Sequence, residues 1–177
     1  IKAFKILVGN EAHNDLGVRV RLISELAEVS GNEGMCGGQM IDLISESKNF
    51  DKEQIIRMNK MKTAAIISFS CMAGGILGGA NIRECQVLKD FGFDIGLAFQ
   101  IVDDILDVEG DENKIGKKIN RDKDLRKKNL VSNYGLKFSK NEAQKLIDNA
   151  NKSLQDNFGE KSRELQEISK FIISRDR

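Results

Sequence analysis

The sequence contains no proline and no tryptophan among its 177 residues, and cysteine is scarce. Because proline interrupts a helix interior, its absence favours long uninterrupted helices. The three cysteines, Cys36, Cys71 and Cys85, are odd in number and lack the spacing of a metal site. We therefore expect reduced, buried thiols in a cytoplasmic protein.

An excess of charge of either sign is also missing. Lys and Arg number 28 against 27 for Asp and Glu, which gives a formal net charge of +1. This balance provides no general attraction to nucleic acid or to an anionic membrane, so we expect any anion site to be local. No signal peptide or membrane span occurs, and the apolar stretch 64–80, which includes Ser68 and Ser70, is typical of a closely packed core helix.

Apolar residues recur every three or four positions through most of the chain, which is the spacing of amphipathic helices. Val18, Leu22, Leu26 and Val29 are one example. No alternating stretch is long enough for a strand, and no repeat or interdomain linker is visible. The sequence therefore predicts one all-α domain over residues 1–177. Its expected helices span 3–8, 18–30, 34–45, 52–77, 82–108, 126–134, 141–157 and 164–174.

Three aspartates end the longest apolar pattern, in the run Asp-Asp-Ile-Leu-Asp at residues 103–107. Residues i and i+4 share a helix face, so Asp103 and Asp107 lie one turn apart, while Asp104 is offset by about 100°. Like charges so placed destabilise a bare helix, and a bound cation would relieve the repulsion. Mg²⁺ prefers oxygen ligands and commonly bridges a carboxylate to substrate phosphates, so the run predicts a Mg²⁺ site.

Two other interpretations of the acidic run are a solvated acidic cluster on an unrelated helical bundle and a calcium-binding EF-hand loop. The first predicts no Mg²⁺-dependent diphosphate binding. The second fails for residues 107–113, because Gly110 is at the wrong position and no bidentate glutamate follows at the required distance.

Cationic residues occur on both sides of this helix in the sequence. Lys62 and Thr63 interrupt an apolar segment, where a lysine can pair with a carboxylate, bind a phosphate, or simply extend its ammonium group to water. Lys117 and Lys127 lie in the polar segment after the aspartates. That segment is either a solvated loop or a cationic lid over a metal–phosphate site.

Four motifs in this order resemble those of the trans-prenyl diphosphate synthases, most closely the bacterial farnesyl diphosphate synthase branch. The resemblance covers the chain from Ala3 to Arg177. The matching segments are the Gly-Gln-x-x-Asp-Leu helix at 34–43, the Lys-Thr-Ala motif at 62–64, the second aspartate-rich motif at 96–107, and the Gly-Asp and Gly-Lys pairs at 110–111 and 116–117.

The resemblance implies an all-α helical bundle of the isoprenoid synthase type. It also implies a prenyltransferase that condenses an allylic diphosphate with isopentenyl diphosphate to give a longer prenyl diphosphate of the farnesyl/geranylgeranyl type. Mg²⁺ is the implied cofactor and a homodimer the implied assembly. Such chemistry needs cations to stabilise the departing diphosphate and an apolar cavity to shield the carbocation from water.

Matched by motif, the resemblance assigns a diphosphate and metal site. Asp103, Asp104 and Asp107 would hold Mg²⁺, directly or through water. Lys62 and Lys117 would contact the allylic diphosphate.

The remaining assignments concern the developing cation and the supporting groups. The Lys62 carbonyl, the Thr63 hydroxyl and Gln100 would face the cation, and Lys127 would be the lysine of the lid segment. Gln39 and Asp42 would support these residues without contacting the substrate. From charge and spacing, we expect Asp42 to hold Lys62 in place.

The chain also departs from the family pattern. Asn120 stands where a glycine is usual, although asparagine tolerates a left-handed backbone, and the lid segment reads Lys127-Lys128-Asn129-Leu130 instead of Lys-x-Thr-Tyr. The first aspartate-rich motif, the Gly-Lys-Arg segment and the paired arginines are not found. We therefore expect the N-terminal helices to be missing from this sequence and the fragment alone to be inactive. A naturally truncated, non-catalytic subunit that binds diphosphate or supports a partner is the alternative.

Overall fold

The computed structural model describes residues 1–45, 47–109 and 129–175. Throughout these residues helix follows helix and no strand occurs, which confirms the predicted all-α fold. The elements are α1 (Lys2–Val8), α2 (Leu16–Ser30), α3 (Met35–Ser45), α4 (Lys52–Asn59), the π-helical turn η1 (Lys60–Ala64), α5 (Ala65–Leu77), α6 (Ile82–Glu109), α9 (Leu130–Tyr134), α10 (Leu136–Phe158), the 3₁₀ turn η2 (Gly159–Ser162) and α11 (Arg163–Ser174).

Local sequence signals set several helix ends. Asp51 and Gln54 form a capping box at the start of α4: the Asp51 carboxylate accepts from Gln54 N–H at 2.8 Å, and the Gln54 side chain accepts from Asp51 N–H at 3.0 Å. Asn81 and Glu84 exchange the same pair of bonds at the start of α6. Gly79 has a φ of 76°, which favours glycine where the chain turns between α5 and α6.

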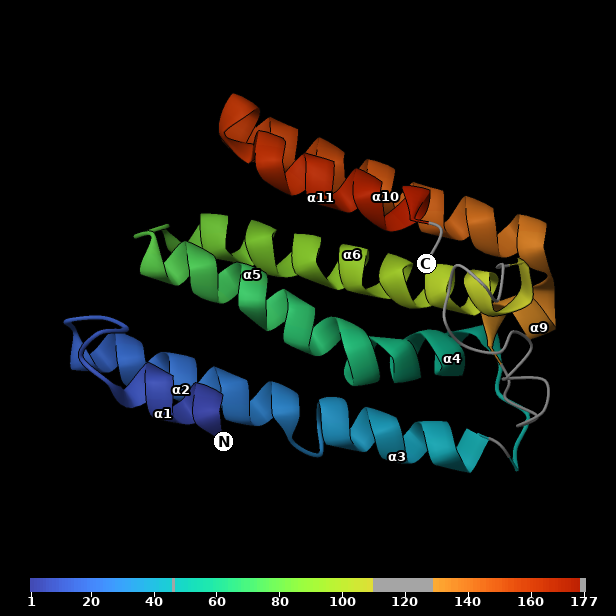
Figure 1. Ribbon diagram of the computed structural model, residues 1–177, viewed down its shortest axis with the longest axis horizontal. Coiled ribbons are helices and arrows are strands. Elements are labelled where there is room, and N and C mark those ends of the chain that lie inside the picture. The colour runs from blue at the N-terminus through green and yellow to red at the C-terminus, as the bar shows by residue number, and fades with distance from the viewer. Residues whose placement is uncertain (46, 110–128, 176–177) are drawn as a thin grey trace.

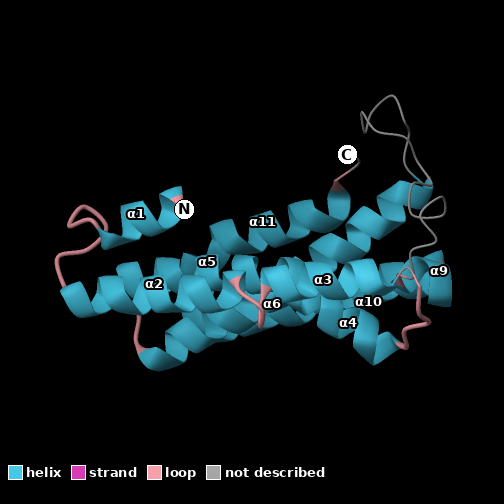
Figure 2. Cartoon of the chain, turned by 90° about the horizontal axis from the view of Figure 1, so that it is seen from below, coloured by secondary structure: helices cyan, strands magenta, loops and turns pink. Residues whose placement is uncertain are grey.

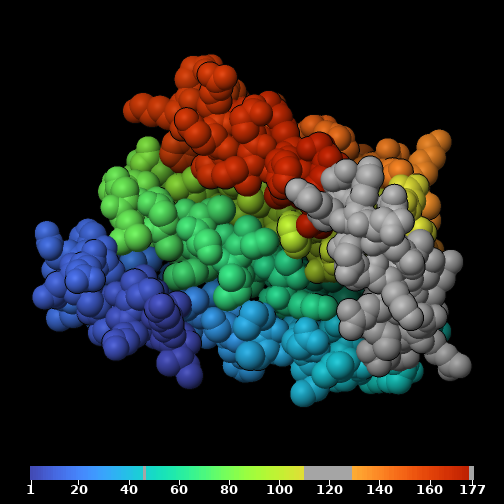
Figure 3. Space-filling view, viewed as in Figure 1, coloured from blue at the N-terminus to red at the C-terminus, as the bar shows by residue number. Residues whose placement is uncertain are grey.

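The long helices lie side by side in a row (Figure 1). The pair α2 and α3 forms one edge, α4 and α5 follow, α6 lies in the centre, and α10 with α11 forms the other edge. Turned by 90°, α1 and α11 stand above the same side of the row (Figure 2). On the face shown in Figure 3, the C-terminal half of α6 is visible between α11 and the segment α4–α5.

Apolar side chains fill both sides of α6. On one side, Phe91 of α6 packs with Ile147 and Leu154 of α10. On the other side, α6 approaches η1 closely because glycine lies at the contact: a Cβ on Gly96 would lie 2.6 Å from Ala64 Cα. This close approach fixes the C-terminal half of α6 against η1, where the predicted site residues occur.

Three predicted details differ from the structure. The helix expected over 52–77 has π geometry at Lys60–Ala64, which apolar spacing does not reveal because the apolar residues continue on both sides. The helix expected over 141–157 begins at Leu136. Of the helix expected over 126–134, residues 130–134 are helical, and 126–128 lie outside the described residues.

The prediction of three buried thiols is wrong for one of them. Cys85 is buried and Cys71 is partly buried, but Cys36 is exposed. The reason is that α3 buries the face that carries Gly38, and Cys36 lies on another side of the helix. Within the part of the chain that the structure describes, the helices are too short or too polar to cross a membrane.

Candidate active site

Lys62 and Asp42 form an ion pair between η1 and α3. The Lys62 ammonium lies 2.8 Å from Asp42 Oδ2, and the Asp42 side chain is only 6% exposed. A carboxylate so buried requires a charged partner, and Lys62 supplies it while keeping part of its own side chain open to solvent. The pairing expected from charge and spacing is therefore present.

A glycine and a π turn place this ion pair. Gly38 lies against the backbone of Lys62, since a Cβ on Gly38 would lie 2.6 Å from Lys62 Cα. In η1, Ala65 N–H donates to Lys60 O, the i→i−5 bond of a π helix. Such turns insert one residue into a helix and often occur at functional sites. The small residues that begin α3 are the one signal in the sequence for this close contact, and no signal there indicates the π turn.

A second set of polar side chains links η1 to α6. The Thr63 hydroxyl donates to Gln100 Oε1 at 2.9 Å, and Gln100 Nε2 donates to Asp104 Oδ1 at 3.1 Å. Gln100 and Asp104 are four residues apart and therefore stack on one face of α6. The structure thus brings Thr63 and Gln100 together, as the family resemblance implies.

The three aspartates of α6 have different surroundings. The Asp103 side chain is 43% exposed, whereas Asp104 and Asp107 are each 5% exposed. Helical geometry separates neighbouring residues by about 100°, so three carboxylates in one short run need not share a direction. Among the aspartates of the run, Asp103 is the one that a solvent-borne cation can reach most readily.

Arg175 is a neighbour of this site that sequence reasoning missed. Its guanidinium lies 3.9 Å from the centre of the Phe99 ring, donates to Phe99 O at 3.0 Å, and approaches Asp103 Oδ1 to 3.8 Å. Burial lowers the pKa of Arg175, and the Asp103 carboxylate opposes that shift. No motif marked this residue, because its contacts join positions 76 residues apart.

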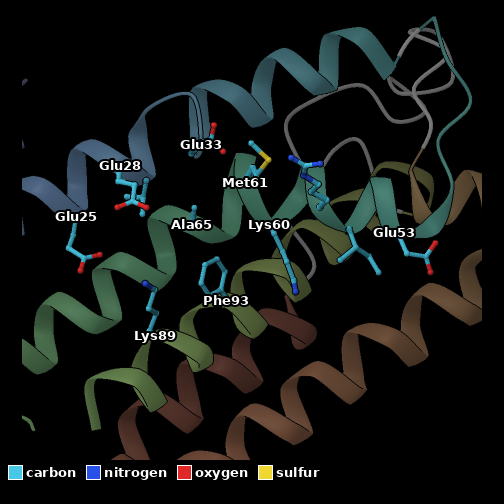
Figure 4. A pocket seen from close by; sticks show the side chains of 12 residues that line it. Glu25, Glu28, Glu33, Glu53, Lys60, Met61, Ala65, Lys89 and Phe93 are labelled. Carbon is cyan, nitrogen blue, oxygen red and sulfur yellow. The ribbon is translucent and has the colours of Figure 1, made fainter. Parts of the chain in front are cut away.

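A pocket of about 540 Å³ lies elsewhere on the molecule (Figure 4). Its lining comes from α2, α4, η1, α5 and α6, and includes Glu28, Lys60, Lys89 and Phe93. Of the predicted site residues that the structure describes, none lines it. Lys60 and Lys62 are two residues apart in η1, yet Lys60 borders this pocket while Lys62 binds Asp42, so the pocket is separate from the polar site.

The family profile described as "Polyprenyl synthetase" matches residues 1–170. The chain belongs to the polyprenyl synthetase family. It is 38% identical to farnesyl diphosphate synthase of Escherichia coli over 163 residues, which cover 90% of this chain and 54% of that protein. It is 35% identical to the chloroplastic geranylgeranyl pyrophosphate synthase of Catharanthus roseus, over 89% of this chain and 44% of that protein.

Solved structures of synthetase family members share the fold. The chain matches an FPP/GFPP synthase from Zymomonas mobilis with a TM-score of 0.82 and 39% identity, over 96% of this chain and 56% of that one. It matches a geranyltransferase from Helicobacter pylori, complexed with magnesium and isoprenyl diphosphate, with a TM-score of 0.80 and 32% identity, over 98% and 56%. The chain spans about half the length of the relatives it matches.

Viewed as a synthetase metal site, the described residues fit a hard cation only in part. Carboxylate oxygens are the ligands that Mg²⁺ prefers, and Asp103 offers one near solvent. However, within residues 1–45, 47–109 and 129–175 no three acidic, histidine or cysteine side chains gather closely enough to hold a metal. Asp104 Oδ1 accepts from Gln100, so the other oxygens around a cation at Asp103 would come from Asp107, substrate phosphate or water. Lys117, Asn120 and Lys127 lie outside the described residues, and Gln39 is exposed.

Proposed function

We propose that the protein, in its complete form, is a Mg²⁺-dependent prenyltransferase that joins an allylic diphosphate to isopentenyl diphosphate. The product is a longer prenyl diphosphate of the farnesyl/geranylgeranyl type. Family membership supports this proposal. The single observation that carries it is the meeting of the Lys62–Asp42 pair with the Thr63–Gln100–Asp104 chain at one π turn. A cationic group is needed beside the departing diphosphate, and oriented oxygens are needed beside the allylic cation.

The ammonium of Lys62 would bind the diphosphate of the allylic substrate. As the carbon–oxygen bond breaks, negative charge grows on the leaving group, and a fixed cation stabilises it. The Lys62 carbonyl, the Thr63 hydroxyl and Gln100 would face the allylic cation left behind. Lys117 and Lys127 would contact the diphosphate from the segment that follows α6.

Asp103 and Asp107 would hold Mg²⁺, directly or through water. Mg²⁺ would neutralise charge on the diphosphate when bound. Asp104 completes the run, but its Oδ1 already accepts the Gln100 amide. We also propose a homodimer, as the family resemblance implies, and a cytoplasmic location, as expected for reduced thiols.

Turnover by the intact protein tests this function. Its mass is measured first, and it is then incubated with isopentenyl diphosphate and a five-carbon allylic diphosphate, with and without Mg²⁺. We expect Mg²⁺-dependent formation of longer prenyl diphosphates. Diphosphate binding without any elongated product would instead favour a non-catalytic subunit.

Two variants of the intact protein test the assigned residues. Lys62→Ala and Asp103→Ala should each lower turnover by several orders of magnitude while the far-ultraviolet circular dichroism is unchanged. A loss of less than tenfold would reject the role of the residue concerned. Residues 1–177 assayed alone should show little or no turnover, because the first aspartate-rich motif that the resemblance implies is not found in this sequence.

A further inference from the structure

The side chains of Asp104 and Asp103 project from different sides of α6. Gln100 lies one turn before Asp104 on the same face of α6, and its Nε2 donates to Asp104 Oδ1 at 3.1 Å. Asp103 lies about 100° away around the helix, on the side where Arg175 approaches. Asp104 is 5% exposed, whereas the side chain of Asp103 is 43% exposed.

The bond to Asp104 determines which way the Gln100 amide faces. An amide side chain can rotate by half a turn and exchange its oxygen and nitrogen. In the structure Asp104 Oδ1 is the acceptor, so Gln100 presents its nitrogen to Asp104. Its oxygen then faces Thr63 and accepts the hydroxyl hydrogen at 2.9 Å.

The orientation of the Gln100 amide decides whether the Thr63 hydroxyl donates or accepts. A hydroxyl has one hydrogen to donate and two lone pairs that accept. Because the hydrogen of Thr63 is used in the bond to Gln100, only lone pairs of its oxygen are left for a substrate. In the opposite arrangement, Gln100 would donate to Thr63, and the hydroxyl hydrogen would point outward with its positive end.

We propose that Asp104 is a positioning residue that fixes the hydrogen-bond direction of Gln100 and Thr63, so that oxygen lone pairs face the allylic cation. Hydrogen bonds in such a chain polarise one another, so the bond to Asp104 increases the partial negative charge on the Thr63 oxygen at the other end. Dipoles oriented before the reaction stabilise charge that develops in the transition state. Because the cation forms only if the protein catalyses prenyl transfer, this role rests on the proposed function.

A double-variant cycle in the intact protein tests this role. Asp104→Asn replaces the accepting carboxylate with an amide that can also donate, and Thr63→Val removes the hydroxyl on which the direction acts. We expect Asp104→Asn to lower kcat at least tenfold in the wild-type background, with substrate KM and the half-saturating Mg²⁺ concentration changed less than threefold. In the Thr63→Val background, the same substitution should cost at least three times less, because residues of one network are not additive.

Equal costs in the two backgrounds, within threefold, would overturn the proposal. So would a tenfold rise in the half-saturating Mg²⁺ concentration, since that result would make Asp104 a metal-holding group. If Asp104→Asn does not fold, Asp104→Glu replaces it in the same cycle. Its extra methylene group displaces the carboxylate from Gln100.

A spectroscopic measurement decides the geometry without turnover. In protein labelled with ¹⁵N at glutamine side chains, the Gln100 amide signal is identified by its loss in Gln100→Met. Asp104→Leu, similar in size but unable to accept, should shift that signal, whereas Asp103→Leu should not. An unchanged signal in Asp104→Leu would overturn the proposal. If the wild-type protein shows no turnover, the proposed function fails, and this measurement still tests the orientation.

Discussion

Gly38 lies directly against the backbone of Lys62, with no room for a side chain between α3 and η1. A Cβ on Gly38 would lie 2.6 Å from Lys62 Cα and also close to Lys62 N. Backbone atoms cannot rotate away as the end of a side chain can. The position of the Lys62 ammonium therefore depends on the absence of one methyl group from α3.

Gly38→Ala should destabilise the protein by about 1–3 kcal/mol, the usual cost of overpacking a closely packed interior. The free energy of unfolding in urea measures the effect. Turnover of the intact protein should fall as well, because relief of the clash moves Lys62.

Gly74→Ala is the matched control for this substitution. Gly74 also lies in a helix, α5, but nothing lies within 4 Å of an added Cβ and the residue is exposed. Alanine is favoured over glycine in a helix interior by about 1 kcal/mol, so Gly74→Ala should stabilise the fold. Two substitutions of the same chemistry should thus have opposite signs. If both were stabilising, the close contact at Gly38 would be wrong.

Asp42→Asn should weaken the hold on Lys62 without changing the shape of the side chain. It leaves the ammonium with a neutral partner at a partly buried position, which should lower the free energy of unfolding by about 1–3 kcal/mol. In the intact protein, kcat should also fall. Both quantities are measured beside those of Lys62→Met and of the double variant.

The double variant distinguishes a true ion pair from two independent residues. If the charges stabilise each other, Asp42→Asn should cost less in the Lys62→Met background than in the wild type, because no ammonium then requires a partner. Equal costs in the two backgrounds would mean that the contact between Lys62 and Asp42 contributes nothing to stability.

The helices and the first contacts of this site follow from local sequence properties. Apolar spacing and the absence of proline predict the helices, and Asp51 marks the start of α4. The Lys62–Asp42 pair could be predicted because opposite charges stand in two apolar, small-residue segments. In each case the decisive signal lies within a few residues of the feature that it predicts.

Other features depend on three-dimensional packing and left no local signal. The π turn at Lys60–Ala64 inserts one residue without disturbing the apolar pattern on either side. Arg175 reaches Phe99 from the end of α11, far away in the sequence. Asp103 and Asp104 are neighbours of identical chemistry, and only the packing around α6 exposes one and buries the other.

Cys36 should be the thiol that reacts first with iodoacetamide at pH 8. Cys36 is exposed, whereas Cys85 is buried. Burial raises the pKa of Cys71 to about 11, so only roughly one molecule in a thousand carries the reactive thiolate at that pH. Mass spectrometry of the native protein should show one rapid adduct, which Cys36→Ser removes. Equally rapid labelling of Cys71 would contradict its burial.

Asp94→Asn should stabilise the protein at neutral pH and have no effect in acid. Burial raises the pKa of the Asp94 carboxyl, with Asp90 adding to the shift and Lys60 opposing it. A raised folded-state pKa means that the ionised form costs stability above that pKa. The cost disappears as pH falls through the raised value towards the ordinary one, near 4. Because Asp94 is only half-buried and water screens its charge, the gain should be a fraction of a kcal/mol.

Urea unfolding of the Asp94→Asn protein between pH 3 and pH 7 measures this dependence, and Lys60→Met provides the reciprocal case. Removing the cation that offsets the carboxylate should destabilise the protein at pH 7 and not at pH 3, where Asp94 is neutral in both states. If the gain in stability from Asp94→Asn is the same across this pH range, the difference between aspartate and asparagine at this position comes from packing and not from the buried charge.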